Sequence, residues 1–282
     1  MPKQLTAPAI AGRKRSTGAD PLVMITAYDA PSARAVDAAG ADLILVGDSL
    51  AMVVLGYDDT LQVTVDDMAH HVAAVARANP RPFVVGDLPR MSYHVEPAET
   101  VRNAATLIRA GAKSVKLEGG RKRLPMIDAI VDAEIPVMGH LGLTPQSVNA
   151  MGGFRVQGKT ADAAMALVDD AKALDAAGCF AIVLEGVPDV VAQRVTEAVS
   201  VPTIGIGAGG GCDGQVLVYH DLLGIEDRMA PKFVRRYADL GGETVEALSA
   251  FVADVRGGAF PDESETYHAS DDLSEALSLY AG

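Results

Sequence analysis

Short apolar runs alternate regularly with longer segments of helical spacing along this chain, and this alternation limits the possible folds. Each apolar run has four to six residues and is rich in Val, Ile and Leu, which is typical of buried parallel strands. The runs are 22–26, 42–47, 83–86, 114–117, 136–139, 180–184, 202–206 and 215–219. The helical segments between them include 30–39, 66–78, 97–110, 161–177 and 189–199. This alternation predicts βαβ units and a parallel sheet covered by helices.

Eight such strands between residues 22 and 219 predict an α/β fold, a (β/α)8 TIM barrel in a single domain. The alternative is a doubly wound open sheet, which a G-x-G-x-x-G motif after the first strand would favour. Residues 25–29 form that turn, and their sequence, Ile-Thr-Ala-Tyr-Asp, lacks the motif. We therefore expect an N-terminal arm at 1–20, a catalytic barrel at 21–258 and an acidic C-terminal tail at 259–282.

Charge and cysteine content exclude several classes of function. The chain of 282 residues has a net charge of −13, and residues 261–282 carry six acidic side chains and no Lys or Arg. We expect no nucleic-acid partner, because phosphate binding requires clustered basic side chains. The presence of only two cysteines, without an apolar leader at 1–20, predicts a reducing, cytoplasmic location. The longest uncharged stretch, 135–154, is interrupted by Pro, Gly and His, so no membrane partner is expected either.

Polar side chains lie at the ends of several runs, where the active sites of such barrels are found. They are Asp48, Ser49, Asp87, Lys116, Glu118, His140 and Glu185. Single members have simpler interpretations: Asp48 and Ser49 suit a helix cap, and Lys116 suits a buried counter-ion without a ligand. His220 and Asp221, after the eighth run, suit the same mouth or a helix cap equally well.

Taken together, these residues point to a metal ion. Four carboxylates at one mouth repel one another strongly unless a cation joins them. Oxygen ligands suit a hard ion such as Mg²⁺, and no Cys or His group has the spacing of a zinc site. Lys116 and Glu118 are two residues apart on one strand, so both side chains can point into the barrel.

Two segments that connect predicted elements are also candidates for contact with a ligand. The loop of about twenty residues after the fifth run, at 141–158, is predicted to act as a lid or binding segment. A glycine cluster at 205–211 follows the seventh run, where a barrel often brings its backbone close to a ligand. Taken alone, that cluster is a weak signal.

Five segments, taken in order, resemble those of one enzyme family. They are 46–49 (VGDS), 86–89 (GDLP), 115–120 (VKLEGG), 139–146 (GHLGLTPQ) and 204–209 (IGIGAG). On these motifs the chain resembles ketopantoate hydroxymethyltransferases over about residues 21–258. The resemblance implies a (β/α)8 barrel that assembles as a homo-oligomer, a decamer in some members.

The resemblance also implies a reaction. The family transfers a hydroxymethyl group from 5,10-methylenetetrahydrofolate to 3-methyl-2-oxobutanoate and gives 2-dehydropantoate, in pantothenate biosynthesis, with Mg²⁺ as cofactor. By position, the implied metal ligands are Asp48, Asp87 and Glu118. The implied substrate-binding residues are Asp48, Ser49, Asp87 and Lys116. Glu185 is the implied proton acceptor, and we expect His140 as an additional pocket residue, in a Mg²⁺-assisted enolate formation followed by aldol-type addition.

Two other functions fit part of the sequence. A Mg²⁺-dependent carbon–carbon lyase or phosphonomutase of related barrel type also binds 2-oxo acids on acidic strand ends, and a catalytic Cys in a mobile loop would favour the lyase. Cys179 precedes a strand and Cys212 follows the seventh run, so neither suits that role well. A non-catalytic, oligomeric binding protein would be favoured by loss of one of the four carboxylates, and all four are present.

Overall fold

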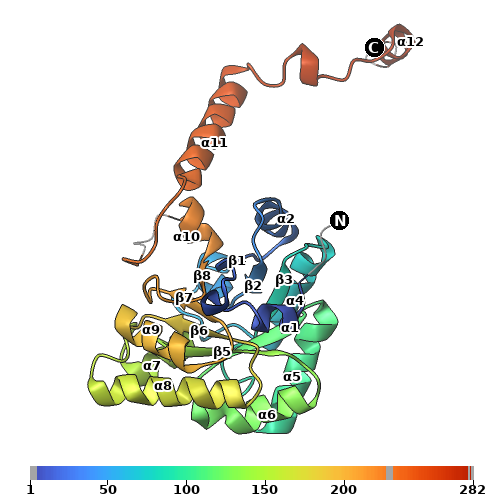
Figure 1. Ribbon diagram of the computed structural model, residues 1–282. Helices are drawn as coiled ribbons and strands as arrows, with labels where there is room; N and C mark the ends of the chain where they lie inside the picture. The colour runs from blue at the N-terminus through green and yellow to red at the C-terminus, as the bar shows by residue number, and fades with distance from the viewer. Residues whose placement is uncertain (1–4, 227–230, 279, 281–282) are drawn as a thin grey trace.

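The computed structural model describes residues 5–226, 231–278 and 280. These described residues contain eight parallel strands, which pair in sequence order and close into a barrel where β8 pairs with β1 (Figure 1). The strands are β1 Leu22–Thr26, β2 Leu43–Val46, β3 Phe83–Asp87, β4 Ser114–Glu118, β5 Val137–Gly142, β6 Ala181–Glu185, β7 Thr203–Ile206 and β8 Gly214–Leu217. The predicted single-domain (β/α)8 TIM barrel is confirmed.

Each predicted apolar run overlaps one observed strand, but four strands extend further along the chain than predicted. Asp87 is the last residue of β3, Glu118 of β4 and Glu185 of β6. His140 lies inside β5, in register with Glu118 and with Val183 of β6. Sheet pairing therefore fixes the backbone of most of the predicted site residues.

A packed apolar cluster fills the barrel below these polar residues. The rings of Phe83 and Phe180 meet edge to face, with centroids 5.7 Å apart. Ile10, from the short helix α1 (Ala7–Ala11), is fully buried in the same cluster. Other members come from the strands: Met24, Leu43, Val85, Met138, Val183, Ile204 and Val216. The polar groups above therefore stand on a close-packed floor.

Helices cover most of the outside of the barrel (Figure 1). They are α2 Ala30–Ala38, α4 Val65–Arg77, α5 Pro97–Ala110, α6 Leu124–Asp132, α8 Ala161–Ala176 and α9 Asp189–Ala198. Five of them match predicted segments. α6 is not among those segments, because its nine mostly apolar residues are too few to separate helical from strand periodicity. Within the described ranges, no helix is long and apolar enough to cross a membrane.

The connection between β7 and β8 differs from the others. Residues 207–213, all of them described, contain no helix and run beside α9. Gly209 and Gly211 permit this approach, since a Cβ at these positions would meet Asp189 and Gln193 of α9. This part of the glycine cluster therefore serves packing between the connection and the helix.

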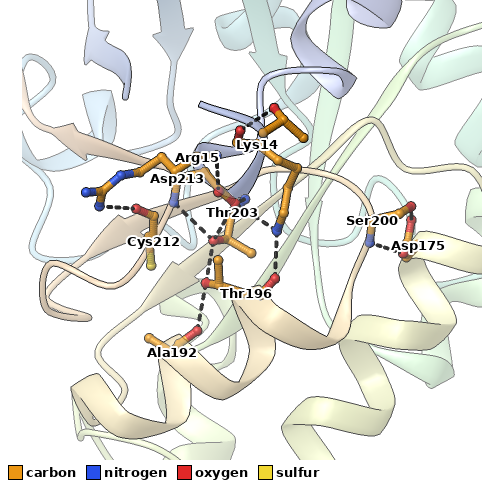
Figure 2. A network of polar contacts seen from close by, with 10 residues as sticks. Lys14, Arg15, Asp175, Ala192, Thr196, Ser200, Thr203, Cys212 and Asp213 are labelled. Carbon is orange, nitrogen blue, oxygen red and sulfur yellow. Dashed lines mark hydrogen bonds and ion pairs between the residues drawn. The ribbon is translucent and has the colours of Figure 1, made fainter. Parts of the chain in front are cut away.

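A buried ion pair fixes the segment before β1 to the base of β7 and β8 (Figure 2). Lys14 Nζ lies 3.0 Å from Asp213 Oδ2 and donates a 2.6 Å hydrogen bond to the carbonyl oxygen of Thr196. Asp213 also accepts hydrogen bonds from the backbone N–H groups of Arg15 and Thr203, each at 2.9 Å. Part of the predicted N-terminal arm is thus packed onto the barrel.

Replacing Lys14 with Met is expected to destabilise the fold by about 3 kcal/mol, because the carboxylate of Asp213 would stay buried without its cation. Urea unfolding followed by circular dichroism measures this loss. Lys159→Met is the matched control: Lys159 is exposed in a loop, and its replacement should change the free energy of unfolding by less than about 0.5 kcal/mol. Equal unfolding midpoints for the two variants would contradict the role given to this ion pair.

The chain beyond β8 leaves the barrel (Figure 1). α10 Tyr219–Leu223 is followed by α11 Leu240–Gly257 and α12 Asp271–Ser278, with a short turn of 3-10 helix between the last two. From residue 242 to its end at 257, the residues of α11 are exposed, among them Leu248 and Phe251. On the barrel, Val23 points outward from β1 and is 46 % exposed, whereas the side chains of β2 to β5 are buried on both faces. The predicted boundary at residue 258 falls directly after α11.

Candidate active site

A cavity of about 570 Å³ opens at the carboxyl ends of the strands. Its lining includes all the site residues predicted from the sequence: Asp48, Ser49, Asp87, Lys116, Glu118, His140 and Glu185. Asp221 lines it as well, whereas His220 lines a separate hollow beside Tyr28. The structure thus brings the predicted residues to one mouth, while the roles given to them stay predictions.

Asp87 and Lys116 form a buried ion pair in this cavity. They are in register on neighbouring strands, and Lys116 Nζ lies 2.8 Å from Asp87 Oδ1. The other carboxylate oxygen of Asp87 accepts a 3.2 Å hydrogen bond from the Asp48 N–H group. Burial raises the pKa of Asp87 to about 7, although Lys116 opposes the shift. Burial alone would lower the pKa of Lys116, but the carboxylates of Asp87 and Glu118 raise it, so the ammonium stays charged.

His140 lies between two carboxylates. Its Nδ1 is 3.3 Å from Lys116 Nζ and 3.5 Å from Glu118 Oε1, and its Nε2 is 3.3 Å from Glu185 Oε2. Burial, and then the charge of Lys116, lowers the pKa of His140, so its ring is neutral. An ammonium group can only donate, so Nδ1 accepts and Nε2 carries the ring proton. That proton faces Glu185, and Nε2 has no aligned hydrogen-bond partner among the described residues.

Glu185 is the most accessible of the four predicted carboxylates. Its side chain is 16 % exposed, whereas Asp48, Asp87 and Glu118 are exposed by 5 % or less. Gly142 fixes the backbone beside it: φ at this glycine is +95°, and a Cβ there would overlap the carbonyl oxygen of Glu185. The same carbonyl accepts a 2.7 Å hydrogen bond from the N–H group after Gly142. β5 thus fixes the backbone that presents Glu185 to the cavity.

The helix-cap interpretation of Asp48 and Ser49 does not describe their side chains. Ser49 occupies the N-cap of the short helix α3 (Leu50–Val53), but its hydroxyl makes no capping hydrogen bond within the described chain. That hydroxyl lies 2.9 Å from the Tyr28 hydroxyl instead. Asp48 Oδ2 accepts a 3.0 Å hydrogen bond from Gln146 Nε2. Both side chains are therefore held at the cavity rather than on the helix.

Two further buried polar residues, Gln146 and Tyr93, support the site, although no sequence pattern predicts a role for them. Gln146 follows β5, and besides its contact with Asp48 its backbone N–H donates to Glu118 Oε2 at 3.1 Å. Tyr93, in the loop between β3 and α5, donates a 2.6 Å hydrogen bond to Gln146 Oε1 and accepts one from Glu118 N–H at 3.2 Å. Gln146 is the last residue of the GHLGLTPQ segment, so its place in this motif could have indicated a role in the site. Tyr93 lies in none of the five motifs, and no sequence feature indicates its role.

The predicted lid loop forms part of the cavity rim. It contains a 3-10 turn, Pro145–Ser147, and the short helix α7, Val148–Met151. Beyond α7, Phe154, Arg155 and Val156 line the cavity, as do Lys232 and Phe233 from the segment after α10. The cavity therefore has an acidic floor and a rim that contains apolar and basic side chains.

Three carboxylates at the ends of neighbouring strands suit a hard divalent ion. Asp48, Asp87 and Glu118 are buried, and burial raises the pKa of Glu118 well above its usual range even though Lys116 opposes this. As they stand, no three His, Cys, Asp or Glu side chains of the described residues are gathered closely enough to hold an ion. Each carboxylate is held by a neighbouring donor instead. The excess of buried negative charge and the all-oxygen donor set nevertheless fit Mg²⁺.

The sequence profile of one enzyme family, described as ketopantoate hydroxymethyltransferase, matches residues 4–263. The chain belongs to this family. A relative from Bradyrhizobium diazoefficiens, 3-methyl-2-oxobutanoate hydroxymethyltransferase 2, is 55 % identical over 256 residues, which are 91 % of this chain and 87 % of the relative. The 3-methyl-2-oxobutanoate hydroxymethyltransferase of Ignicoccus hospitalis is 57 % identical over 250 residues, 89 % of this chain and 95 % of the relative. The family resemblance seen in the motifs is confirmed.

Solved structures match this ketopantoate hydroxymethyltransferase family member in fold. The crystal structure of 2,3-dimethylmalate lyase, a PEP mutase/isocitrate lyase superfamily member, aligns with a TM-score of 0.59 over 99 % of both chains. At 18 % sequence identity this likeness concerns the barrel alone. Family membership decides for a hydroxymethyltransferase over a lyase or phosphonomutase, and for an enzyme over a non-catalytic binding protein. The lyase would be favoured by a catalytic Cys in a mobile loop, whereas Cys179 and Cys212 are both buried.

Proposed function

We propose that this protein transfers a hydroxymethyl group from 5,10-methylenetetrahydrofolate to 3-methyl-2-oxobutanoate, giving 2-dehydropantoate, with Mg²⁺ as cofactor. The observation that carries the proposal is that the acidic strand ends, Lys116 and Glu185 share one cavity. This cavity belongs to a chain more than half identical to enzymes named for that keto acid. The residues of the cavity also suit the two steps that the reaction requires, which are binding of the 2-oxo acid and removal of its C3 proton.

The floor of the cavity suits the keto acid. Asp48, Asp87 and Glu118 would hold Mg²⁺, which when bound supplies positive charge for the 2-oxo and carboxylate oxygens. The Lys116 ammonium and the Ser49 hydroxyl would bind the substrate carboxylate. Other cavity residues are apolar and suit the isopropyl end of the substrate: Leu45, Val183, Ile206 and Val216.

Glu185 would remove the proton from C3 of the keto acid. It is the most accessible of the four carboxylates at the strand ends, and its described contact is with the neutral ring of His140 rather than with a cation. The Nε2–H group of His140 faces Glu185 Oε2 at 3.3 Å without an aligned hydrogen bond, and its partial positive charge would attract the carboxylate towards the ring. C3 then forms a bond with the one-carbon unit in the space below the rim, while that unit leaves the two folate nitrogens. Water supplies the oxygen of the new hydroxyl group. The proton from C3 and one from that water restore the two N–H groups of tetrahydrofolate, which is released.

A product assay tests the proposal. Purified protein is incubated with 3-methyl-2-oxobutanoate, 5,10-methylenetetrahydrofolate and Mg²⁺, and proton NMR follows 2-dehydropantoate. We expect product with Mg²⁺, none after treatment with EDTA, and recovery when Mg²⁺ is added in excess. Failure to form product under any of these conditions would overturn the proposed function.

We also propose that the protein forms a homo-oligomer through α11. Its apolar residues follow helical spacing on one side, at Val245, Leu248, Phe251, Val252 and Val255, and each is between 42 % and 64 % exposed. The barrel in turn leaves the outer side of β1 and β8 accessible. In a reciprocal contact between two copies, α11 of each chain would cover the outer side of β1 and β8 of the other.

Charged residues on the apolar side of α11 are expected to break this assembly. The variant Leu248→Asp/Phe251→Asp should shift the mass measured by light scattering towards the 29.3 kDa of one chain. Ala250→Asp/Ala253→Asp places the same charges on the opposite side of α11 and should leave the mass unchanged. A wild-type protein that is already monomeric, or two variants of equal mass, would contradict this interface.

A further inference from the structure

Gln146 connects more parts of the site than its place in a loop suggests. The residue is 2 % exposed. Its side-chain nitrogen donates to Asp48 Oδ2 at 3.0 Å and to the carbonyl oxygen of Leu88 at 2.9 Å. Its backbone N–H donates to Glu118 Oε2 at 3.1 Å. A single residue in the loop after β5 therefore binds two carboxylates, one that follows β2 and one at the end of β4.

The orientation of the Gln146 amide is fixed by its partners. A carbonyl oxygen can only accept, so the side-chain atom that faces the carbonyl of Leu88 must be the NH₂ group. The other side-chain atom, Oε1, then accepts the 2.6 Å hydrogen bond from the Tyr93 hydroxyl. That hydroxyl is held in turn by the N–H group of Glu118 at 3.2 Å. Every polar atom of the Gln146 side chain thus has a buried partner, and the amide cannot rotate without losing several hydrogen bonds.

The three acidic residues need such partners. Burial raises the pKa of Glu118, and the charges of Asp48 and Asp87 add to the effect, so the three carboxylates repel one another in a region of low dielectric. Lys116 forms an ion pair with Asp87. In the described structure, its Nζ forms no ion pair, with an N···O distance of 4 Å or less, with Asp48 or Glu118. For those two carboxylates the holding donors come from Gln146.

We propose that Gln146 is a positioning residue, which holds one oxygen of Asp48 and one of Glu118 so that the remaining oxygens face a divalent ion. The inference rests on the proposed Mg²⁺ site. Partners of this kind orient metal ligands, and their loss typically weakens metal binding by about 10- to 100-fold. Arg90 fixes the turn itself, since its guanidinium donates a 2.8 Å hydrogen bond to the carbonyl oxygen of Gln146.

Gln146→Met tests the inference, because Met keeps the length of the side chain and removes its donors. Mn²⁺ serves as the probe, and the EPR signal of free Mn²⁺ gives the affinity without reference to catalysis. We expect Mn²⁺ affinity to fall by about tenfold or more. Gln157→Met is the matched control: Gln157 lies in the same loop, but its side chain donates to the carbonyl oxygen of Arg155. This control should bind Mn²⁺ like the wild type.

A second variant separates positioning from general loss of structure. Tyr93→Phe removes the hydroxyl that holds both Gln146 and Glu118, and keeps the ring. It should lower Mn²⁺ affinity in the same direction, and the double variant should lose less than the two single losses combined, because the two residues act as one unit. This variant also carries the test if Gln146→Met does not fold. Melting temperatures measured in EDTA report any purely structural effect separately.

The outcomes are distinguishable. Wild-type Mn²⁺ affinity in Gln146→Met or, where that variant does not fold, in Tyr93→Phe would overturn the inference. So would a Gln157→Met control that loses as much. If the wild type makes product and binds Mn²⁺ while these variants bind it equally well, only the role of Gln146 fails. If the wild type binds no Mn²⁺ and makes no product, the proposed function fails.

Discussion

Glu185→Gln is expected to slow hydroxymethyl transfer by about 10²- to 10⁴-fold, the usual contribution of a positioned general base. A glutamine amide has nearly the shape of the carboxylate but cannot accept the proton from C3. The first step can be followed without the folate co-substrate. Proton NMR in D₂O should show that the C3 hydrogen of 3-methyl-2-oxobutanoate exchanges with solvent in the wild type with Mg²⁺, and not in the variant.

The remaining properties of this variant decide how the result is interpreted. Glu185 is not among the residues proposed to hold the ion, so Mn²⁺ and keto acid should bind nearly as in the wild type. Glu197→Gln, on the exposed side of α9, is the control and should exchange at the wild-type rate. Exchange at an unchanged rate in Glu185→Gln would remove Glu185 from the role of base. Loss of keto acid binding in that variant would make it a binding residue instead.

Asp87→Asn is expected to weaken divalent-metal binding by at least about 100-fold. Removing a residue that only hydrogen-bonds to a metal ligand lowers metal affinity by up to about 100-fold. Asp87 is proposed as a ligand itself, so its loss should cost at least as much. The substitution also takes the ion-pair partner from Lys116, whose Nζ lies 2.8 Å from Asp87 Oδ1. Mn²⁺ titration monitored by EPR measures the loss, and product formation at saturating Mg²⁺ should stay far below that of the wild type.

A control for net charge accompanies this variant. Asp58→Asn removes the same charge from an exposed position beyond α3 and should leave Mn²⁺ affinity unchanged. Normal affinity in Asp87→Asn would contradict its assignment as a ligand. An equal loss in both variants would show that the overall charge of −13, rather than a built site, attracts the ion.

The barrel and most of its site were predictable because both follow from short-range patterns. Buried parallel strands read as apolar runs, and the carboxyl ends of such strands meet at one mouth, so Asp48, Asp87, Glu118 and Glu185 were expected together. The exact strand ends were not predictable. His140 is two residues inside the actual end of β5, because register with β4 and β6, rather than the local apolar pattern, sets where this strand ends.

Contacts between segments that are distant in the sequence could not be predicted. Gln146 and Asp48 are 98 residues apart, and no periodicity predicts that a loop amide reaches a carboxylate on another strand. The same holds for Lys14 and Asp213, whose ion pair joins the two ends of the barrel sequence. The path of α11 away from the barrel is also not set by its own residues, since an amphipathic helix only requires some apolar surface to cover it.

Asp48, Asp87 and Glu118 are proposed to hold one divalent ion where the keto acid binds. Titration of the wild type with Mn²⁺, monitored by EPR with and without 3-methyl-2-oxobutanoate, measures whether they do. We predict one Mn²⁺ site per chain, bound more tightly when the keto acid is present, because each ligand strengthens the binding of the other. No tight site, or a site whose affinity is the same with and without the keto acid, would contradict the claim.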